Sequence, residues 1–174
     1  RFSQTLPVIT EDSQTVVNIY ELKNFHEYIN DQILSVGIFL SAANSFGDDD
    51  VRISDRLYLP SSKLRGFESG RIGPLDNGDF VGGNYASSFN AQANLPLLQS
   101  FETMDFNIFY DAANVWGVDY DSSINDSNEI RSAAGIGVDW YTPIGPLSFS
   151  LAQPISKKST DKTESFRFNL GTTF

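Results

Sequence analysis

The sequence contains no cysteine, one histidine (His26) and one methionine among its 174 residues. Without cysteine, a disulfide framework, a thiolate zinc site and a cysteine nucleophile are excluded. A single histidine cannot form a histidine metal cluster and offers little for general-base catalysis. We therefore expect a protein that is not an enzyme and that needs no cofactor or metal.

Basic residues are also scarce, with 12 Lys and Arg against 22 Asp and Glu and a formal net charge of −10. A nucleic-acid partner is not expected, because nucleic-acid binding needs a basic face. No run of about 18 apolar residues occurs, which excludes a transmembrane helix. The chain starts at Arg1 without a signal segment, so we expect a mature chain or a piece of a longer one.

The mean hydropathy of −0.23 is ordinary for a soluble protein. This value is uninformative here, because a transmembrane β-barrel alternates lipid-facing and lumen-facing residues and averages as mildly polar. Aromatic residues make up 13% of the chain, which provides apolar surface to bury and argues against disorder. Helix signals are few, and the best candidate, residues 20–32, lacks a 3.6-residue apolar stripe.

Alternation with a period of two residues dominates the sequence and predicts strands. Between residues 104 and 111, for example, Met104, Phe106, Ile108 and Tyr110 alternate with Asp105, Asn107, Phe109 and Asp111. The pattern predicts strands near residues 3–10, 14–23, 33–43, 52–59, 82–95, 104–115, 130–141, 146–154 and 165–174. Several are longer than the usual soluble strand of about five or six residues. They match the roughly nine to eleven residues that cross a bilayer.

The predicted connections alternate between short and long. Residues 142–145 form a tight turn, whereas residues 116–129, 155–164 and 60–81 form longer links. Short periplasmic turns opposite long extracellular loops are typical of membrane barrels. The aromatic residues Trp116, Trp140, Tyr141 and Phe174 lie near strand ends, where barrels carry aromatic girdles. On this pattern alone, a soluble β protein with aromatic strand ends remains the alternative.

Two short motifs are better explained by structure than by chemistry. The acidic run from Asp119 to Ser123 begins like a calcium loop but lacks the required Gly and Glu, so we interpret it as a solvated loop. Gly135 and Gly137 lack the third glycine of a phosphate-binding loop. We expect these glycines to thin the lumen face of a strand where other groups approach closely.

The most informative segment is residues 60–81, in which Leu64, Phe67 and Ile72 are interspersed with arginine and glycine. A loop of this length in a compact protein is usually functional. If it folds into a barrel lumen, Arg65 needs a carboxylate partner, because a desolvated guanidinium is costly when unpaired. The alternation places Asp111 on the lumen face, which makes it the best candidate. Spacing alone does not exclude a surface arginine and a polar strand-end aspartate.

These residues resemble the BamA superfamily of outer-membrane insertases and translocators. Leu64, Arg65, Gly66 and Phe67 are similar to its loop-6 motif, and we call residues 60–81 loop 6. Four other segments match in order: residues 72–74 with 82–84, 109–116, 140–154, and 166–174. The resemblance covers residues 52–174, whereas the first 50 residues fit only as generic barrel strands.

The resemblance implies an all-β fold, namely a transmembrane antiparallel β-barrel. Residues 1–174 would supply about eight or nine carboxy-terminal strands of a larger barrel of about sixteen strands. Loop 6 would span about 60–81 and the closing strand about 165–174, and the periplasmic modules would be absent from this chain.

The resemblance also implies the roles of individual residues. Arg65 would pair with Asp111 inside the barrel, with Gln92 at the position where the family often has a second acidic acceptor. Because Gln92 adds no charge, Arg65 would rely more on Asp111. The closing strand and gate would comprise Phe166, Phe168, Leu170, Gly171 and Phe174, and Gly171 would let the strand kink inward.

The implied function is the folding and insertion of outer-membrane proteins through a lateral gate, where a client strand pairs with an exposed strand edge. The implied partners are the lipid bilayer, unfolded outer-membrane protein clients and accessory lipoproteins, in a bacterial outer membrane. A translocator pore of the same superfamily, of the two-partner secretion or TamA-like kind, is the alternative. A small stand-alone barrel or β-sandwich is a third reading. An isolated half-barrel would self-associate through its strand edges.

Overall fold

The computed structural model describes residues 1–5, 15–29, 32–46, 49–95, 103–125, 129–143 and 145–171. The strands are β1 (Phe2–Thr5), β2 (Thr15–Ile29), β3 (Gln32–Ser45), β4 (Leu75–Asp76), β5 (Asp79–Phe80), β6 (Tyr85–Leu95), β7 (Met104–Trp116), β8 (Arg131–Thr142), β9 (Gly145–Ser156) and β10 (Phe166–Leu170). One 3₁₀ turn, η1 (Ile53–Asp55), precedes loop 6. Within these ranges no helix is long and apolar enough to cross a membrane.

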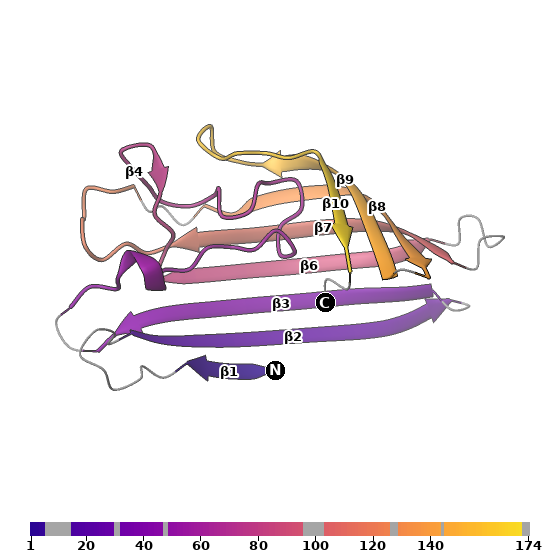
Figure 1. Ribbon diagram of the computed structural model, residues 1–174, viewed down its shortest axis with the longest axis horizontal. Coiled ribbons are helices and arrows are strands. Elements are labelled where there is room, and N and C mark those ends of the chain that lie inside the picture. The colour runs from indigo at the N-terminus through magenta and orange to yellow at the C-terminus, as the bar shows by residue number, and fades with distance from the viewer. Residues whose placement is uncertain are drawn as a thin grey trace.

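Eight of the strands form one antiparallel sheet in the order β1-β2-β3-β6-β7-β8-β9-β10 (Figure 1). The strands β4 and β5 form a separate small ribbon within loop 6. Six strands of the large sheet are 11 to 15 residues long, which is the length that crosses a bilayer. The predicted all-β fold and strand count are therefore confirmed.

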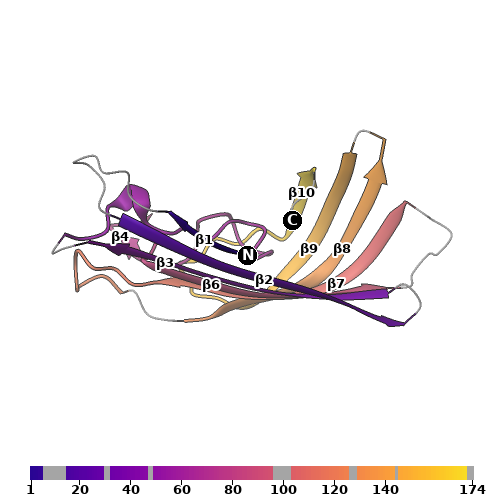
Figure 2. The same cartoon turned by 90° about the horizontal axis from the view of Figure 1, so that it is seen from below.

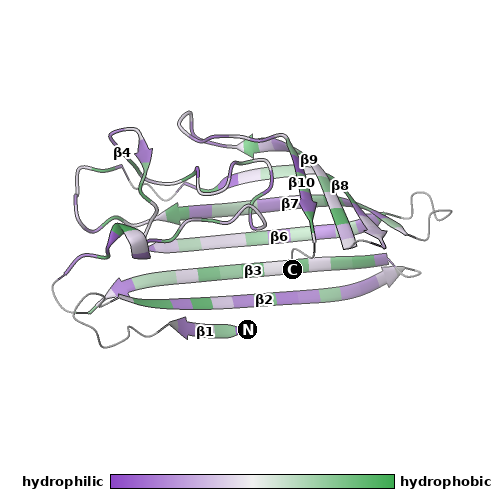
Figure 3. Cartoon of the chain, viewed as in Figure 1, coloured by the Kyte–Doolittle hydropathy of each residue, from purple (hydrophilic) through white to green (hydrophobic). Residues whose placement is uncertain are grey.

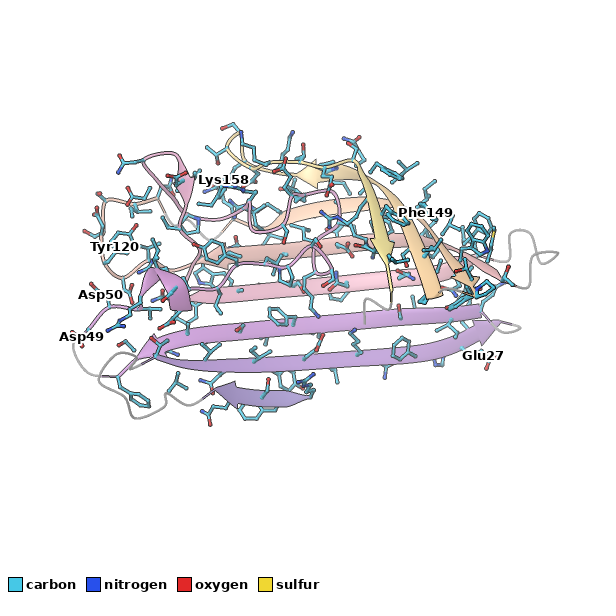
Figure 4. The ribbon with its side chains drawn as sticks, in the orientation of Figure 1. Glu27, Asp49, Asp50, Tyr120, Phe149 and Lys158 are labelled. Carbon is cyan, nitrogen blue, oxygen red and sulfur yellow. The ribbon has the colours of Figure 1, made fainter. Side chains whose placement is uncertain are left out.

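The large sheet is curved, and loop 6 lies against its concave face (Figure 2). The tight links β2–β3 and β8–β9 share one end of the sheet, here called the turn end, with the β6–β7 link of residues 96–103. The longer links β1–β2, β3–β6, β7–β8 and β9–β10 share the other end, the loop end. Figure 4 shows Asp50 and Tyr120 at the loop end, and Glu27 and Phe149 toward the turn end. The tight turn predicted near residues 142–145 and the longer links predicted on either side of it are present, whereas the β6–β7 link is nearly as long as the β9–β10 link.

The pleat of the strands separates two kinds of surface. Hydrophobic and hydrophilic residues are interspersed along the strands rather than collected in blocks (Figure 3). On the convex face, the register aligns Ile108, Ile136, Leu151 and Phe166 across four strands. Each of these side chains is 45–57% exposed. A continuous exposed apolar row of this kind is typical of a surface that faces lipid.

Several strand boundaries differ from the prediction. Residues 52–59 do not form a strand: they contain η1, and Leu57 makes only an isolated bridge to Gly83. Val51 and Leu59 are buried but Ile53 between them is 59% exposed, so the apolar alternation there does not mark one buried face of a strand. The segment is irregular, and the Arg56 side chain donates to the Val51 carbonyl within it. The strand expected at 14–23 extends to Ile29. Residues 6–10 and 172–174 of two predicted strands lie outside the described residues.

The buried core lies between loop 6 and the concave face. Loop 6 and its approach contribute the large side chains Leu59, Leu64, Phe67 and Ile72, whereas the sheet contributes the smaller Ala86, Ala113, Val115 and Ala133. Small residues on the sheet leave room for the loop to pack closely. The loop is thus part of the hydrophobic core.

Candidate functional site

Arg65 of loop 6 is joined to Asp111 of β7 by a two-pronged ion pair. Its Nε donates to Asp111 Oδ2 at 2.7 Å, and its Nη2 donates to Asp111 Oδ1 at 2.9 Å. The backbone N–H of Arg65 also donates to Asp111 Oδ2, at 3.0 Å. Asp111 is completely buried. This fork fixes orientation as well as distance, because two parallel charge-assisted bonds allow little rotation.

Two amide side chains of β6 complete this arrangement. Gln92 Oε1 accepts a hydrogen bond from Arg65 Nη1 at 2.9 Å. Asn90 Nδ2 donates to Asp111 Oδ1 and to the Lys63 carbonyl, both at 2.9 Å. The structure therefore brings Arg65 together with both expected partners, and Asn90 is an additional contact that the sequence did not indicate.

An aromatic ring forms the floor under the guanidinium. The Cζ of Arg65 lies 3.5 Å from the ring centroid of Phe109, a cation–π geometry. That ring occupies the space over Gly135, where a Cβ atom would come within 2.5 Å of Phe109 Cζ. A Cβ at Gly137 would likewise approach Asn107 Oδ1 to 2.5 Å. Both glycines thin the concave face. At Gly135 the backbone of β9 comes close as well, because a Cβ would lie 2.1 Å from the Leu151 carbonyl oxygen, whereas at Gly137 the neighbour is a side chain.

The rest of the loop-6 motif packs against the sheet. Leu64 and Phe67 are buried, at 2% and 1% exposure. Gly66 has φ +89°, and a Cβ there would lie 3.0 Å from the Cβ of Ala133. Glycine is therefore required twice at this position, by the backbone conformation and by the close approach.

Loop 6 has further charged contacts on both flanks. Lys63 forms an ion pair with Glu21 of β2, and its Nζ lies 5.0 Å from the Phe39 ring centroid. On the opposite flank, Arg167 of β10 donates to the carbonyls of Ser61 and Phe67. The loop is consequently attached to strands on both sides of the Arg65–Asp111 pair.

A second buried ion pair was not predicted. Arg131, at the start of β8, donates through Nε and Nη2 to Asp161 at 3.1 and 3.2 Å. The side chains of both residues are at most 1% exposed. Arg131 Nη1 also donates to Asn114 Oδ1 at 2.5 Å. This pair ties the β9–β10 connection to the loop end of β7 and β8.

The acidic run beginning at Asp119 is not fully solvated, contrary to the expectation. Asp119 accepts hydrogen bonds from Arg56 Nη2 at 2.7 Å, from Val51 N–H at 2.9 Å and from Asn84 Nδ2 at 2.8 Å. Burial acts to raise the pKa of Asp119, but these hydrogen bonds and the Arg56 charge outweigh it and hold the pKa below its usual value of 3.8. The expectation failed because Arg56 lies 63 residues away in the sequence.

The closing-strand residues form no site of their own. Phe166, Phe168 and Leu170 are 50–67% exposed on the convex face, at the sheet edge. Gly171 has φ +103° and nothing within 4 Å of a Cβ position. The backbone there adopts a conformation that favours glycine. Phe174 lies outside the described residues.

Comparison with known proteins identifies the family. The model of the Omp85 superfamily domain matches residues 1–174. The chain belongs to the Omp85 superfamily. The predicted resemblance to BamA-type proteins is confirmed by curated relatives. The chain is 32% identical over 139 residues to the outer membrane protein assembly factor BamA of Neisseria meningitidis, covering 64% of this chain and 17% of that protein. It is 29% identical to BamA of Neorickettsia risticii, covering 83% of this chain and 20% of that protein.

The Omp85 assignment also agrees with a solved structure. The crystal structure of BamA from Haemophilus ducreyi lacking POTRA domains 1–3 superposes with a TM-score of 0.85 at 27% identity, over 96% of this chain and 36% of that chain. The barrel architecture is thus shown, and the concave face of the sheet corresponds to the barrel lumen. The matches also confirm the predicted location in the bacterial outer membrane. The chain spans about a fifth of the length of these curated relatives.

Proposed function

We propose that this chain is the carboxy-terminal part of the barrel of an outer-membrane protein assembly factor. The observation that carries the proposal is the docking of Arg65 on the buried Asp111 inside a sheet that superposes on a BamA barrel. Both curated relatives reported above are assembly factors, which favours an insertase over a translocator pore.

In the proposed mechanism, β10 offers its free edge to a client strand. In the described residues β10 pairs only with β9, so the backbone groups on its other side can bond an incoming strand. Gly171, whose φ is +103°, would give the closing strand the freedom to kink inward and so weaken the pairing of this edge. The client strand then enters the bilayer sideways, through a lateral gate. β10 forms one side of this gate, and the first strand of the complete barrel forms the other.

The two faces of the sheet have different proposed roles. The apolar convex face contacts lipid, whereas the polar concave face holds loop 6 as a fixed support. No ATP or ion gradient is required, because pairing the client backbone and burying its apolar face in lipid are both favourable. Unfolded outer-membrane proteins are the proposed clients and lipoproteins the proposed accessory partners. The isolated chain, with β1 and β10 as free edges, would self-associate.

The test is client assembly by the full-length protein in liposomes, measured as the conversion of a urea-unfolded outer-membrane barrel to its heat-modifiable folded form. Arg65→Ala is expected to slow assembly about tenfold or more, because a tenfold slower rate corresponds to an activation free energy that is higher by roughly 1.4 kcal/mol. Arg71→Ala, at an exposed position in the same loop, is the matched control and should retain activity. Absence of assembly by the unmodified protein would refute the insertase proposal. Equal rates for Arg65→Ala and the unmodified protein would refute the role of the loop anchor.

A further inference from the structure

Arg167 connects the closing strand to loop 6 through hydrogen bonds to the loop backbone. Its Nη1 donates to the Ser61 carbonyl at 2.8 Å, and its Nη2 donates to the Phe67 carbonyl at 2.7 Å. Its Nε also donates to Glu164 Oε2 at 3.0 Å. One carbonyl precedes the loop-6 motif and the other belongs to its last residue, Phe67. The Arg167 side chain is only 10% exposed. One guanidinium thus spans the motif from the side of the gate.

The connection that precedes β10 follows the same loop. The Glu68 N–H donates to the Lys162 carbonyl at 3.0 Å, and the Glu164 N–H donates to the Gly66 carbonyl at 3.1 Å. Phe67 and Thr163 form an isolated antiparallel bridge. These backbone contacts hold the connection on the loop, whereas Arg167 holds the strand itself.

The remaining support of β10 is limited. The strand has five residues and, in the part of the chain that the structure describes, its backbone pairs with that of β9 alone. If β10 moves away from loop 6, both bonds from Arg167 to the loop must break, and these are charge-assisted bonds of the stronger kind. Conversely, if loop 6 leaves the concave face, the acceptors of Arg167 move with it.

We propose that Arg167 is a positioning residue that latches the closing strand to loop 6. The position of the gate strand and the docking of Arg65 on Asp111 are thereby energetically coupled. The proposal rests on the proposed function, because in an insertase the Arg167 contact would control how often the edge of β10 is free to pair with a client strand. Glu164 orients the guanidinium, and lysine is a poor substitute because an ammonium lacks the planar fork that reaches two carbonyls and a carboxylate.

The latch is tested by distance measurement between two spin labels in the full-length protein in lipid. The chain has no cysteine, so Ser35→Cys on β3 and Asn169→Cys on β10 label two positions that line the same hollow of the concave face. With Arg167 present we expect one narrow distance distribution. Arg167→Gln should shift it to a broad distribution with longer distances, and Arg167→Lys should restore part of the narrow component. Lys157→Gln, at an exposed lysine of the same connection, should leave it unchanged.

Coupling is tested by combining variants. Arg65→Ala should also broaden the distribution, and adding Arg167→Gln should broaden it little further, because both changes break one linked arrangement. If Arg167→Gln destabilises the barrel, Glu164→Gln serves as the milder variant and should give an intermediate shift. An unchanged distribution in Arg167→Gln, or additive effects of the two changes, would overturn the latch. Client assembly is scored separately: a latch without assembly refutes only the proposed function, and assembly with no Arg167 effect refutes only the latch.

Discussion

The strands β7 and β10 both hold loop 6, but they differ in how firmly they are held themselves. β7 has 13 residues, pairs with strands on both sides and buries Asp111 completely. β10 has five residues, pairs on one side and exposes its large apolar side chains. Loop 6 is therefore attached at two points. The Arg65–Asp111 contact, here called the wall contact, joins it to a strand that is paired on both sides, and the Arg167 contact, here called the edge contact, joins it to the edge of the sheet.

The chemistry of the two attachments differs in the same direction. At β7 a carboxylate is buried, and its charge is costly to leave unpaired. At β10 the acceptors are two neutral carbonyls beside a hollow that Ser61 and Arg167 help to line. Breaking the first contact leaves a buried, unpaired charge, whereas breaking the second leaves two neutral carbonyls and an Arg167 that is still paired with Glu164. We therefore expect the wall contact to remain formed, whereas the edge contact can break when β10 moves away from loop 6.

The strongest test of this contrast is Arg65→Met, which removes the charge from the wall contact and leaves Asp111 buried. We expect the free energy of unfolding to fall by roughly 3–5 kcal/mol, as measured by denaturant titration in detergent micelles. Arg71→Met in the same loop should change it by less than about 0.5 kcal/mol. Similar small values for both variants would show that the buried pair does not stabilise the barrel.

The next largest effect distinguishes the two faces of the sheet. Ile136→Lys places a charge on the convex face near the middle of β8, which should cost roughly 2–4 kcal/mol in a bilayer. Ser148→Lys is the matched control on the concave face. The Ser148 Oγ donates to Asp139 Oδ1 at 2.5 Å, so a lysine there has a carboxylate beside it. The free energy of folding into lipid vesicles is measured for both variants. Equal costs for the two lysines would contradict the assignment of the convex face to lipid.

A smaller effect tests the floor of the Arg65 site. Gly135→Ala would place a Cβ 2.1 Å from the Leu151 carbonyl oxygen and 2.5 Å from Phe109 Cζ, so both the β9 backbone and the Phe109 ring would have to move. Overpacking of this kind costs roughly 1–3 kcal/mol. Gly37→Ala is the control, because the nearest atoms to its Cβ position lie 3.8–4.0 Å away. Denaturant titration of the two variants should separate them, and identical stabilities would argue against close packing at Gly135.

The smallest expected effect concerns the loop end. Because the pKa of Asp119 is lowered in the folded protein, its contribution to stability is present above the usual value of 3.8 and is lost as the pH falls below it, through the folded pKa. The hydrogen-exchange protection factor of the Val51 amide, which donates to Asp119 Oδ2, should therefore fall below pH 3.8. Asp119→Asn should show lowered protection already at neutral pH. If the protection of this amide in the unmodified protein does not change over this range, the Arg56–Asp119 contact does not hold this segment.

The sequence predicted local features well and distant contacts poorly. Period-two alternation found most strands, because each pleat records which face is buried. It failed at residues 52–59, where alternation arises in an irregular segment. The alternation made Asp111 the best candidate partner of Arg65 but did not exclude a surface arginine, and Gln92 was expected only from the family resemblance. Arg131 with Asp161 and Arg167 with Ser61 were missed, because nothing local in a strand identifies a partner 30 or 106 residues away.

Backbone hydrogen exchange of the full-length protein in lipid tests the contrast between wall and edge most directly. The Arg65 amide lies in a loop, yet it donates to Asp111 at 3.0 Å in a buried site. It should therefore exchange as slowly as the amides of β7, whereas the amides of β10 should exchange faster than both. Exchange of the Arg65 amide at the rate of an open loop, or protection of β10 equal to that of β7, would contradict the account.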